Sequence, residues 1–218
     1  QAIFIGTGVW RPRKLGVPGE SLGHVHYAIE YLRNPNVYRL GKRVAVIGAG
    51  NVAMDVARTA FRHGCEEVFI ICRRDKLSAR DLEVEYARLD GAQIMFCKTP
   101  TRFVDEGVML VDNKIVQDED GKEKAVPMND IETLFPVDSI IIAVGQGPRA
   151  VIVSSTTGIN VISDGLVAVD ELGHTSREGV FASGDVVTGA KTVVEAVKVS
   201  RKVAEAMDQY CQDLQKRK

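Results

Sequence analysis

The residues best suited to chemistry in this sequence are two glycines and an alanine that follow a short apolar run. The run is Val44–Ile47, and the spacing after it is Gly48-x-Gly50-x-x-Ala53. Gly48 lets the chain turn sharply, and Gly50 removes a side chain where a pyrophosphate must approach the backbone. Ala53 keeps a following helix close to the strand. The pattern predicts a strand, a tight turn and a helix that together bind a dinucleotide.

The start of the expected helix supplies the groups that an anion needs. Asn51 and Val52 lie at its beginning, where the N–H groups are free and carry a partial positive charge. We therefore expect the pyrophosphate to bind over Gly48–Val52. A glycine-rich turn that binds nothing is the alternative, and the strand and helix on either side of the turn favour binding.

A pair of arginines, Arg73 and Arg74, follows the next apolar run, Glu67–Cys72. This run predicts a second strand and completes a βαβ unit of about 30 residues. Sites that prefer NAD usually carry Asp or Glu near this offset, whereas Arg accommodates the 2′-phosphate of NADP. The pair therefore predicts NADP(H). Two solvated arginines at the end of a strand are the alternative, and Asp75 could pair with either one.

The bulk composition is that of an ordinary globular protein. The chain has 218 residues, of which 45% are hydrophobic and 26% charged, and its formal net charge is −1. This balance gives no electrostatic footprint for nucleic acid. No apolar run approaches the roughly 20 residues of a membrane span. We therefore expect neither a nucleic acid nor a membrane as a partner.

The four cysteines are scattered and indicate core packing. The sequence has no Cys-x-x-Cys pair, which argues against a redox-active disulfide and against a zinc or iron–sulfur site. Scattered cysteines suit a reducing compartment, so we expect a cytoplasmic protein. The charged run Asp118–Lys122 fits a solvated hairpin tip better than a metal site, and no metal is predicted.

The apolar runs and the breakers between them predict an α/β chain. Buried strands are expected at 2–5, 44–47, 67–72 and 139–144, and further strands at 92–98, 165–170 and 180–182. Helices are expected at 24–33, 52–62, 81–89 and from 191 onward. Between 101 and 124 the pattern changes to short strands, at 103–104, 108–111 and 114–116, separated by polar turns. This change predicts an antiparallel meander inserted into the α/β domain.

Four motifs in this order resemble those of two-dinucleotide-binding flavoprotein reductases, specifically those like the glutamate synthase small subunit. The motifs are Ile5–Gly8, Gly48–Asp55 with Cys72–Asp75, Ala143–Gln146, and Gly179–Asp185 followed by Gly189–Val194. The second is similar to the NADPH domain of that family. The first and third resemble the two crossover turns that join its FAD and NADPH domains, and the fourth is similar to its C-terminal FAD motif. The resemblance extends over nearly the whole chain.

The resemblance implies a Rossmann-like, three-layer (ββα) NADP-binding domain with the inserted meander, plus the C-terminal part of an FAD-binding domain. We expect the end of one FAD-domain half and a connector helix over residues 1–40. The NADP(H)-binding domain then covers 41–142, and the C-terminal part of the FAD domain covers 143–218. The family's FAD domain begins with its own glycine-rich βαβ unit, which this sequence lacks, as it lacks an iron–sulfur segment. Because it also opens on Gln1, we expect a fragment.

The resemblance also implies cofactor-binding residues. For NADP(H) these are Gly48, Gly50, Asn51, Val52, Ala53, Arg73, Arg74, Gly145 and Gln146. For FAD they are Gly6, Thr7, Gly8, Gly184, Asp185, Lys191, Thr192 and Val193. Asp185 would accept a hydrogen bond from the flavin's ribityl chain, and the helix start near Thr192 would direct N–H groups at the flavin N1/O2 edge. No catalytic residue is predicted, since hydride transfer depends on the positions of two rings.

The implied function is that of an NADPH-dependent flavoprotein oxidoreductase. Such a protein passes hydride from NADPH to FAD and onward to an iron–sulfur partner or a glutamate synthase large subunit. Because half of the FAD site is missing, we expect that this chain does not retain FAD and is inactive alone. The alternative is an NADP(H)-binding module with no bound FAD and no activity of its own. Ser200 departs from the family, which often has Gly there.

Overall fold

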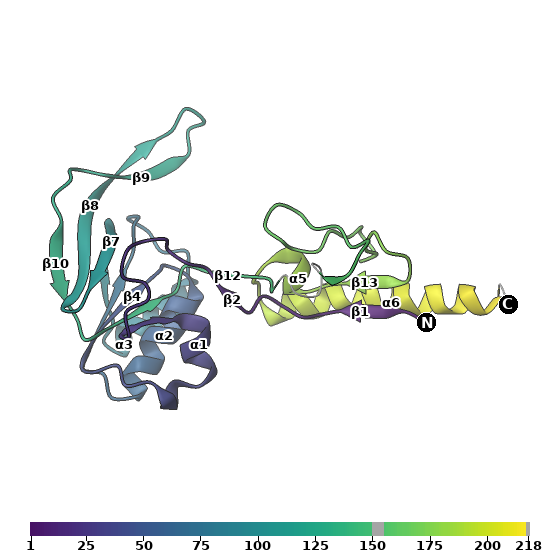
Figure 1. The fold of residues 1–218 in the computed structure, drawn as a ribbon, viewed down its shortest axis with the longest axis horizontal. Coiled ribbons are helices and arrows are strands. Elements are labelled where there is room, and N and C mark those ends of the chain that lie inside the picture. The colour runs from purple at the N-terminus through teal and green to yellow at the C-terminus, as the bar shows by residue number, and fades with distance from the viewer. Residues whose placement is uncertain (150–154, 217–218) are drawn as a thin grey trace. The chain divides into compact units, whose positions relative to one another are not determined.

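The computed structural model describes residues 1–149 and 155–216. The chain forms two compact units (Figure 1). Pro12–Val144 form the first, here called the central unit, and Gln1–Arg11 with Gly145–Lys218 form the second, here called the terminal unit. Residues 150–154 and 217–218, which belong to the predicted third segment, lie outside the described residues.

A five-stranded parallel sheet forms the middle layer of the central unit. Its strand order is β3-β11-β4-β5-β6, and all neighbours are parallel. The strands are β3 (Val25–Tyr27), β4 (Arg43–Ile47), β5 (Glu67–Ile71), β6 (Gln93–Met95) and β11 (Ser139–Ile142). Because parallel strands end at the same edge of a sheet, the segments that follow β4, β5 and β11 lie close together.

Helices cover one face of this sheet and the meander covers the other (Figure 1). The helices are α1 (Ala28–Arg33), α2 (Asn51–Arg62) and α3 (Asp81–Leu89), with a short 3-10 turn η1 (Pro35–Val37). Alternate residues of β4 belong to the two cores: Val44 and Val46 pack with the helices, and Ala45 and Ile47 with the meander. The Rossmann-like ββα arrangement is confirmed.

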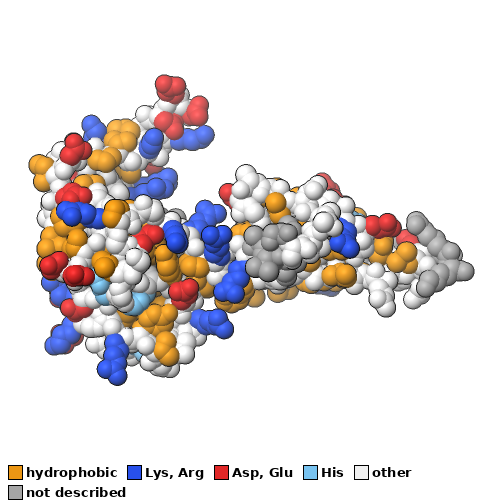
Figure 2. Space-filling view, in the orientation of Figure 1, with side chains coloured by type: hydrophobic (Ala, Val, Ile, Leu, Met, Phe, Trp, Pro, Cys, Tyr) orange, Lys and Arg blue, Asp and Glu red, His pale blue; other side chains and the backbone are white. Residues whose placement is uncertain are grey.

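The meander is antiparallel and centres on β8. Its strands are β7 (Lys98–Val104), β8 (Gly107–Gln117), β9 (Glu123–Pro127) and β10 (Thr133–Pro136). β7 and β10 flank the first part of β8, and β9 pairs with its second part. The hairpin tip at Asp118–Lys122 is confirmed; it is exposed and carries charges of both signs (Figure 2).

Three details of the elements differ from the predictions. The helix expected from His24 begins only at Ala28, because Val25–Tyr27 pair with β11 as an edge strand. Burial beside β11 therefore outweighs the helical spacing of the sequence. β8 is one strand rather than two. The two polar residues near its middle point to opposite faces of the sheet, Asp112 to solvent and Asn113 to the interior, so they fit the strand without a turn. The strand expected at 165–170 forms only isolated bridges.

The terminal unit is built on a parallel pair of strands. These are β1 (Ile3–Ile5) and β13 (Val180–Ala182), with Ile5 opposite Ala182. The other elements are β2 (Arg11–Pro12) paired with β12 (Gln146–Gly147), the short helix α5 (Asp185–Thr188) and the long helix α6 (Val193–Lys216). Phe181 of β13 packs against Tyr210 of α6, with ring centroids 5.7 Å apart.

Much of the apolar surface of the terminal unit faces solvent. The first strand was expected to be buried, but 61% of Ile3 and 45% of Phe4 is exposed. At the start of α6, Val193 and Val194 are 79% and 77% exposed. The expectation of a buried β1 is therefore wrong for two of its three residues, because the unit provides no further layer over them among the described residues. No helix in the described part of the chain is long and apolar enough to span a membrane.

Tyr31 offers a test of the central core. Its side chain is fully buried, its hydroxyl has no hydrogen-bond partner among the described residues, and burial raises the pKa of Tyr31 to about 12. We expect Tyr31→Phe to raise the free energy of unfolding by about 1 kcal/mol, because a buried hydroxyl without a partner is lost. Urea unfolding measures this, with Tyr38→Phe, which is partly exposed, as the control. A lower stability for Tyr31→Phe would contradict the prediction.

Candidate functional site

The turn after β4 is fixed by the neighbouring strand. The N–H of Gly48 donates to the carbonyl of Ile71, 3.1 Å away, so the turn begins while β4 is still held against β5. A Cβ atom at Gly48 would lie 2.4 Å from the carbonyl oxygen of Ala143, which follows β11. No side chain fits there without moving the backbone, and the turn requires glycine for this reason.

Gly50 has a different role, because the fold does not require its lack of a side chain. A Cβ atom there would meet no atom closer than the Ser78 Oγ, 3.7 Å away. Gly50 is the N-cap residue of α2, has extended backbone angles and makes no side-chain capping bond. The first turn of α2 carries no acidic residue, while Ala53 is fully buried against the sheet. The start of α2 therefore has no side-chain cap, and no acidic side chain of its first turn balances the positive end of the helix dipole. Such a helix start suits an anion.

The segment before α3 folds over this turn. The N–H groups of Ser78 and Ala79 both donate to the carbonyl of Ala49 at 2.9 Å. The N–H of Arg80 donates to the Asn51 Oδ1, also at 2.9 Å. Asn51, expected at the pyrophosphate, therefore also ties the glycine turn to the segment that carries the arginines. The sequence analysis missed these contacts, because they join residues whose spacing forms no recognised motif.

Arg73 and Arg74 follow β5 directly, at the same edge of the sheet as the glycine turn. Both side chains are exposed. Neither arginine forms an ion pair within residues 1–149 and 155–216, and Asp75 pairs with neither of them. Two guanidinium groups without a protein counter-ion can bind a phosphate by paired charge-assisted hydrogen bonds.

The next cation along, Lys76, does have a partner. It forms a hydrogen-bonded ion pair with Glu123 of β9, so the hairpin reaches back to the segment after β5. The hydrogen bond and charge of Lys76, with a smaller contribution from Arg74, lower the pKa of Glu123. Because both side chains of this pair are largely exposed, its contribution to stability is small.

In the terminal unit, the residues expected at FAD gather at the carboxyl ends of β1 and β13. The register of the two strands brings Gly6-Thr7-Gly8 beside Ser183-Gly184-Asp185, and the N–H of Ser183 donates to the carbonyl of Ile5 at 3.4 Å. The Asp185 Oδ1 accepts the N–H of Lys191 at 3.3 Å, which tethers the segment before α6 to the start of α5. These predicted residues therefore form one cluster.

The start of α6 is a capping box, which the sequence analysis missed. The Glu195 carboxylate accepts the N–H of Thr192 at 3.1 Å and its hydroxyl at 2.8 Å, while the Thr192 Oγ1 accepts the N–H of Glu195 at 3.3 Å. The spacing Thr-x-x-Glu is readable from sequence and places the first helical residue at Val193. Thr192 is therefore the N-cap residue and not a helical one.

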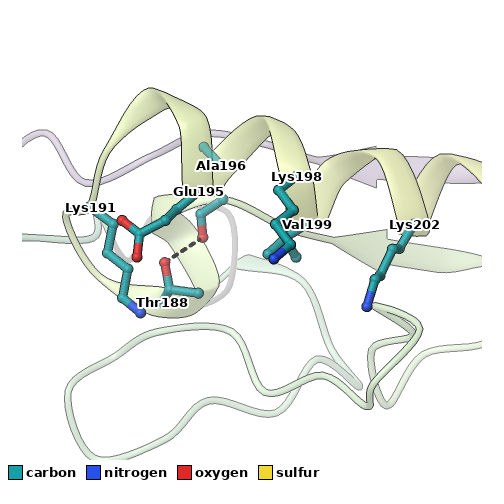
Figure 3. Close-up of a pocket in the computed structure, with 8 residues that line it drawn as sticks. Thr188, Lys191, Glu195, Ala196, Lys198, Val199 and Lys202 are labelled. Atoms are coloured by element: carbon teal, nitrogen blue, oxygen red, sulfur yellow. Dashed lines mark hydrogen bonds between the residues drawn. The ribbon is translucent and has the colours of Figure 1, made fainter.

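A small cavity lies beside this helix start (Figure 3). Its volume is about 200 Å³, and its lining residues are Gly184, Thr188, Lys191, Glu195, Ala196, Lys198, Val199 and Lys202. Three of these side chains are lysines, so the cavity suits a negatively charged group. The hydroxyl of Ser200 meets that of the buried Ser183 at 2.6 Å, which explains how a serine is accommodated at this helix position.

Two further points of the sequence analysis concern metal ligands and the second crossover turn. No group of three or more His, Cys, Asp or Glu side chains that could hold a metal ion is present in the described part of the chain. Gly145 and Gln146 belong to the terminal unit, so their assignment to NADP(H) stays a prediction.

Comparison with known proteins identifies relatives. A family model described as pyridine nucleotide-disulphide oxidoreductase matches residues 1–201. The beta subunit of the NADP(+)-dependent formate dehydrogenase of Moorella thermoacetica is 39% identical, and the small chain of the NADPH glutamate synthase of Halomonas elongata is 33% identical. Each alignment covers 96% of this chain but only 31% and 49% of the respective relative. The chain thus spans a third to a half of their lengths.

Solved structures show the same fold. FprA from Mycobacterium tuberculosis, in complex with NADPH, superposes with a TM-score of 0.79 at 18% identity, over 99% of this chain and 64% of FprA. Thioredoxin reductase from T. acidophilum gives 0.73 at 25% identity, over 98% of this chain and 66% of the reductase. At the identity of FprA, the likeness concerns the fold alone.

The two glycines of the turn should respond differently to a methyl group. We expect Gly48→Ala to lower the free energy of unfolding by about 1–3 kcal/mol, because its Cβ overlaps the Ala143 carbonyl oxygen. Gly50→Ala is the matched control and should change it by less than about 0.5 kcal/mol, since its Cβ would meet only the Ser78 Oγ, at an ordinary contact distance of 3.7 Å. Urea unfolding of both variants measures this, and equal losses would contradict the assignment of Gly48 as the sterically required glycine.

Proposed function

The chain belongs to the pyridine nucleotide-disulphide oxidoreductase family, and from this premise we propose that it is the NADPH-binding part of an FAD-dependent oxidoreductase. The observation that carries the proposal is the set of residues gathered at one edge of the central sheet. There the uncapped start of α2 and Gly50, whose Cβ would meet no atom closer than 3.7 Å, lie together with two arginines that form no ion pair within the described residues. These are the features that a dinucleotide with a 2′-phosphate requires.

In this proposal the central unit binds NADP(H) through two contacts. The N–H groups from Gly50 to Val52 hold the pyrophosphate, whose approach depends on the missing side chain of Gly50. Arg73 and Arg74 hold the 2′-phosphate. Gly145 and Gln146 belong to the terminal unit, and their assignment to NADP(H) rests on the family resemblance alone. Ala53 and Gly48 act indirectly, because they keep α2 and β4 in position.

The terminal unit provides part of an FAD site. We assign Gly6, Thr7 and Gly8, together with Gly184 and Asp185, to the sugar and linker of the flavin nucleotide. We assign Lys191, Thr192 and Val193 to the flavin edge, where the ammonium group of Lys191 and the N–H of Val193 would favour the reduced flavin. The N–H groups of Lys191 and Thr192 already donate to Asp185 and Glu195. When both cofactors are bound, hydride passes from the nicotinamide to the flavin.

Two features suggest that this unit does not hold FAD alone. The cavity beside α6 has about 200 Å³, less than the roughly 300–1,000 Å³ of small-molecule sites. Ile3, Phe4, Val193 and Val194 leave apolar surface open on both β1 and α6. From the family resemblance we assign residues 1–40 to the end of one FAD-domain half and a connector helix, 41–142 to the NADP(H) domain and 143–218 to the C-terminal part of the FAD domain. Of the first segment, residues 12–40 belong to the central unit, where β3 pairs with β11.

The onward electron acceptor is proposed by analogy with relatives. The names of those relatives describe subunits of a formate dehydrogenase and of a glutamate synthase. An iron–sulfur protein or a glutamate synthase large subunit is therefore the proposed partner. The second candidate function is an NADP(H)-binding module without FAD, and the exposed apolar surface of the terminal unit favours it for the chain as given.

Cofactor selectivity tests the central site. We expect the double variant Arg73→Ala with Arg74→Ala to weaken NADP⁺ binding by at least about tenfold and to leave NAD⁺ binding within about twofold. Loss of charge-assisted bonds to a phosphate, at about 1.5–3 kcal/mol, has this size. Isothermal titration calorimetry measures both ligands, and Arg62→Ala, an exposed arginine at the end of α2, is the matched control. Equal binding of NADP⁺ and NAD⁺ by the unaltered chain would refute the assignment.

The colour of the purified chain separates the two candidate functions. We expect a colourless protein that binds no FAD when the cofactor is added in excess, because the terminal unit leaves its apolar faces uncovered. Visible absorbance after gel filtration, normalised to protein concentration, measures the FAD content. One FAD per chain would show that the described elements suffice for the flavin site and would exclude the binding module without FAD.

A further inference from the structure

The backbone that carries the two arginines is held by the inserted meander. Three consecutive carbonyl groups after β5 each accept a hydrogen bond from β7, from the residue just before it, or from β8. The Cys72 carbonyl accepts the N–H of Lys98 at 3.0 Å, and the Arg74 carbonyl accepts the N–H of Cys97 at 3.1 Å. Between them, the Arg73 carbonyl accepts a hydrogen bond from the Asn113 Nδ2 at 2.9 Å. Only this middle bond comes from a side chain.

The side chain of Asn113 is buried and hydrogen-bonded. It lies in β8 with 5% of its surface exposed, and it is one of three buried polar residues among those described. Its Nδ2 group also donates to the Thr99 Oγ1 at 2.6 Å. Both amide hydrogens are therefore used, one on the arginine segment and one on β7, so the side chain has one orientation.

The same residue also fixes the neighbouring corner of the chain. The N–H of Asn113 donates to the Cys97 carbonyl at 2.8 Å. Cys97 has φ of 54°, the only positive φ of a non-glycine residue in the described ranges. Its N–H, held in this conformation, is the donor to the Arg74 carbonyl. The side chain of Asn113 thus acts on Arg73 directly, whereas its backbone N–H, which other residues would also supply, holds Cys97 beside Arg74.

We propose that Asn113 is a positioning residue that sets the preference of the site for NADP(H) over NAD(H). The inference rests on the proposed function of Arg73 and Arg74. Two exposed arginine side chains select a phosphate only if their backbones present them toward the same point. The three carbonyl bonds hold the peptide planes of this segment, and Asn113 is the one side chain that makes such a bond. NAD⁺ has no 2′-phosphate, so its binding does not depend on this arrangement.

Asn113→Leu tests the proposal, because leucine has a similar size and cannot donate to the Arg73 carbonyl. Asn113→Ser is the second variant, in case the first does not fold. We expect either folded variant to weaken NADP⁺ binding by about tenfold, which corresponds to 1.4 kcal/mol, and to leave NAD⁺ binding within twofold. Isothermal titration calorimetry of the full chain gives both constants. Hydrogen exchange over residues 73–76 should become faster in the same variants.

Ser139→Ala is the matched control, since Ser139 is another buried polar residue of the central unit, at the amino end of β11. It should leave the NADP⁺/NAD⁺ ratio unchanged. If folded Asn113 variants keep the wild-type ratio while Arg73→Ala loses it, the positioning role is overturned and the arginine assignment stands. If Arg73→Ala and Arg74→Ala also keep the ratio, the proposed function itself fails. Equal weakening of both ligands by Asn113→Leu would show a purely structural role.

Discussion

The close approach of Gly48 to the Ala143 carbonyl is the constraint on which the central unit depends. A Cβ atom at Gly48 would lie 2.4 Å from that oxygen, so the ends of β4 and β11 can meet only at a glycine. This contact leaves the turn at the same edge as the end of β5, whose carbonyl at Ile71 accepts the Gly48 N–H. The start of α2 and the arginine pair consequently face the same region, and the binding chemistry follows from this meeting of three strand ends.

Local patterns in the sequence were sufficient for the elements that set up this edge. The apolar run of β4, the glycine spacing and the breaker His63-Gly64 are short-range signals, and the structure ends α2 at Arg62 accordingly. β3 and β10 could not be predicted in the same way. Each exists because a partner strand distant in sequence provides the other half of its hydrogen bonds, β11 for Val25–Tyr27 and β8 for Thr133–Pro136.

The residues of the candidate site also differ in whether the sequence could predict them. Glycine and arginine positions follow from motif spacing, and the capping box of Thr192 and Glu195 could also have been found from its spacing. Asn113 could not. Its hydrogen bond to the Arg73 carbonyl forms only because β8 passes beside the segment after β5. In the sequence it is one polar residue among the strands of the meander. Residues that act through backbone contacts over long sequence distances leave no local signal.

The meander thus contributes to two parts of the central unit. Phe103, Val108 and Leu110 cover the second face of the parallel sheet and close its core. Asn113, Cys97 and Lys98 fix the segment that carries the arginines. Because both sets lie on or beside the same two strands, the register of β7 against β8 couples the packing of the core to the geometry of the proposed phosphate site. The terminal unit has no comparable layer over β1 in the described residues, and its apolar side chains remain exposed. The proposed NADP(H) contacts of the central unit and the proposed FAD contacts of the terminal unit therefore rest on separate sets of residues.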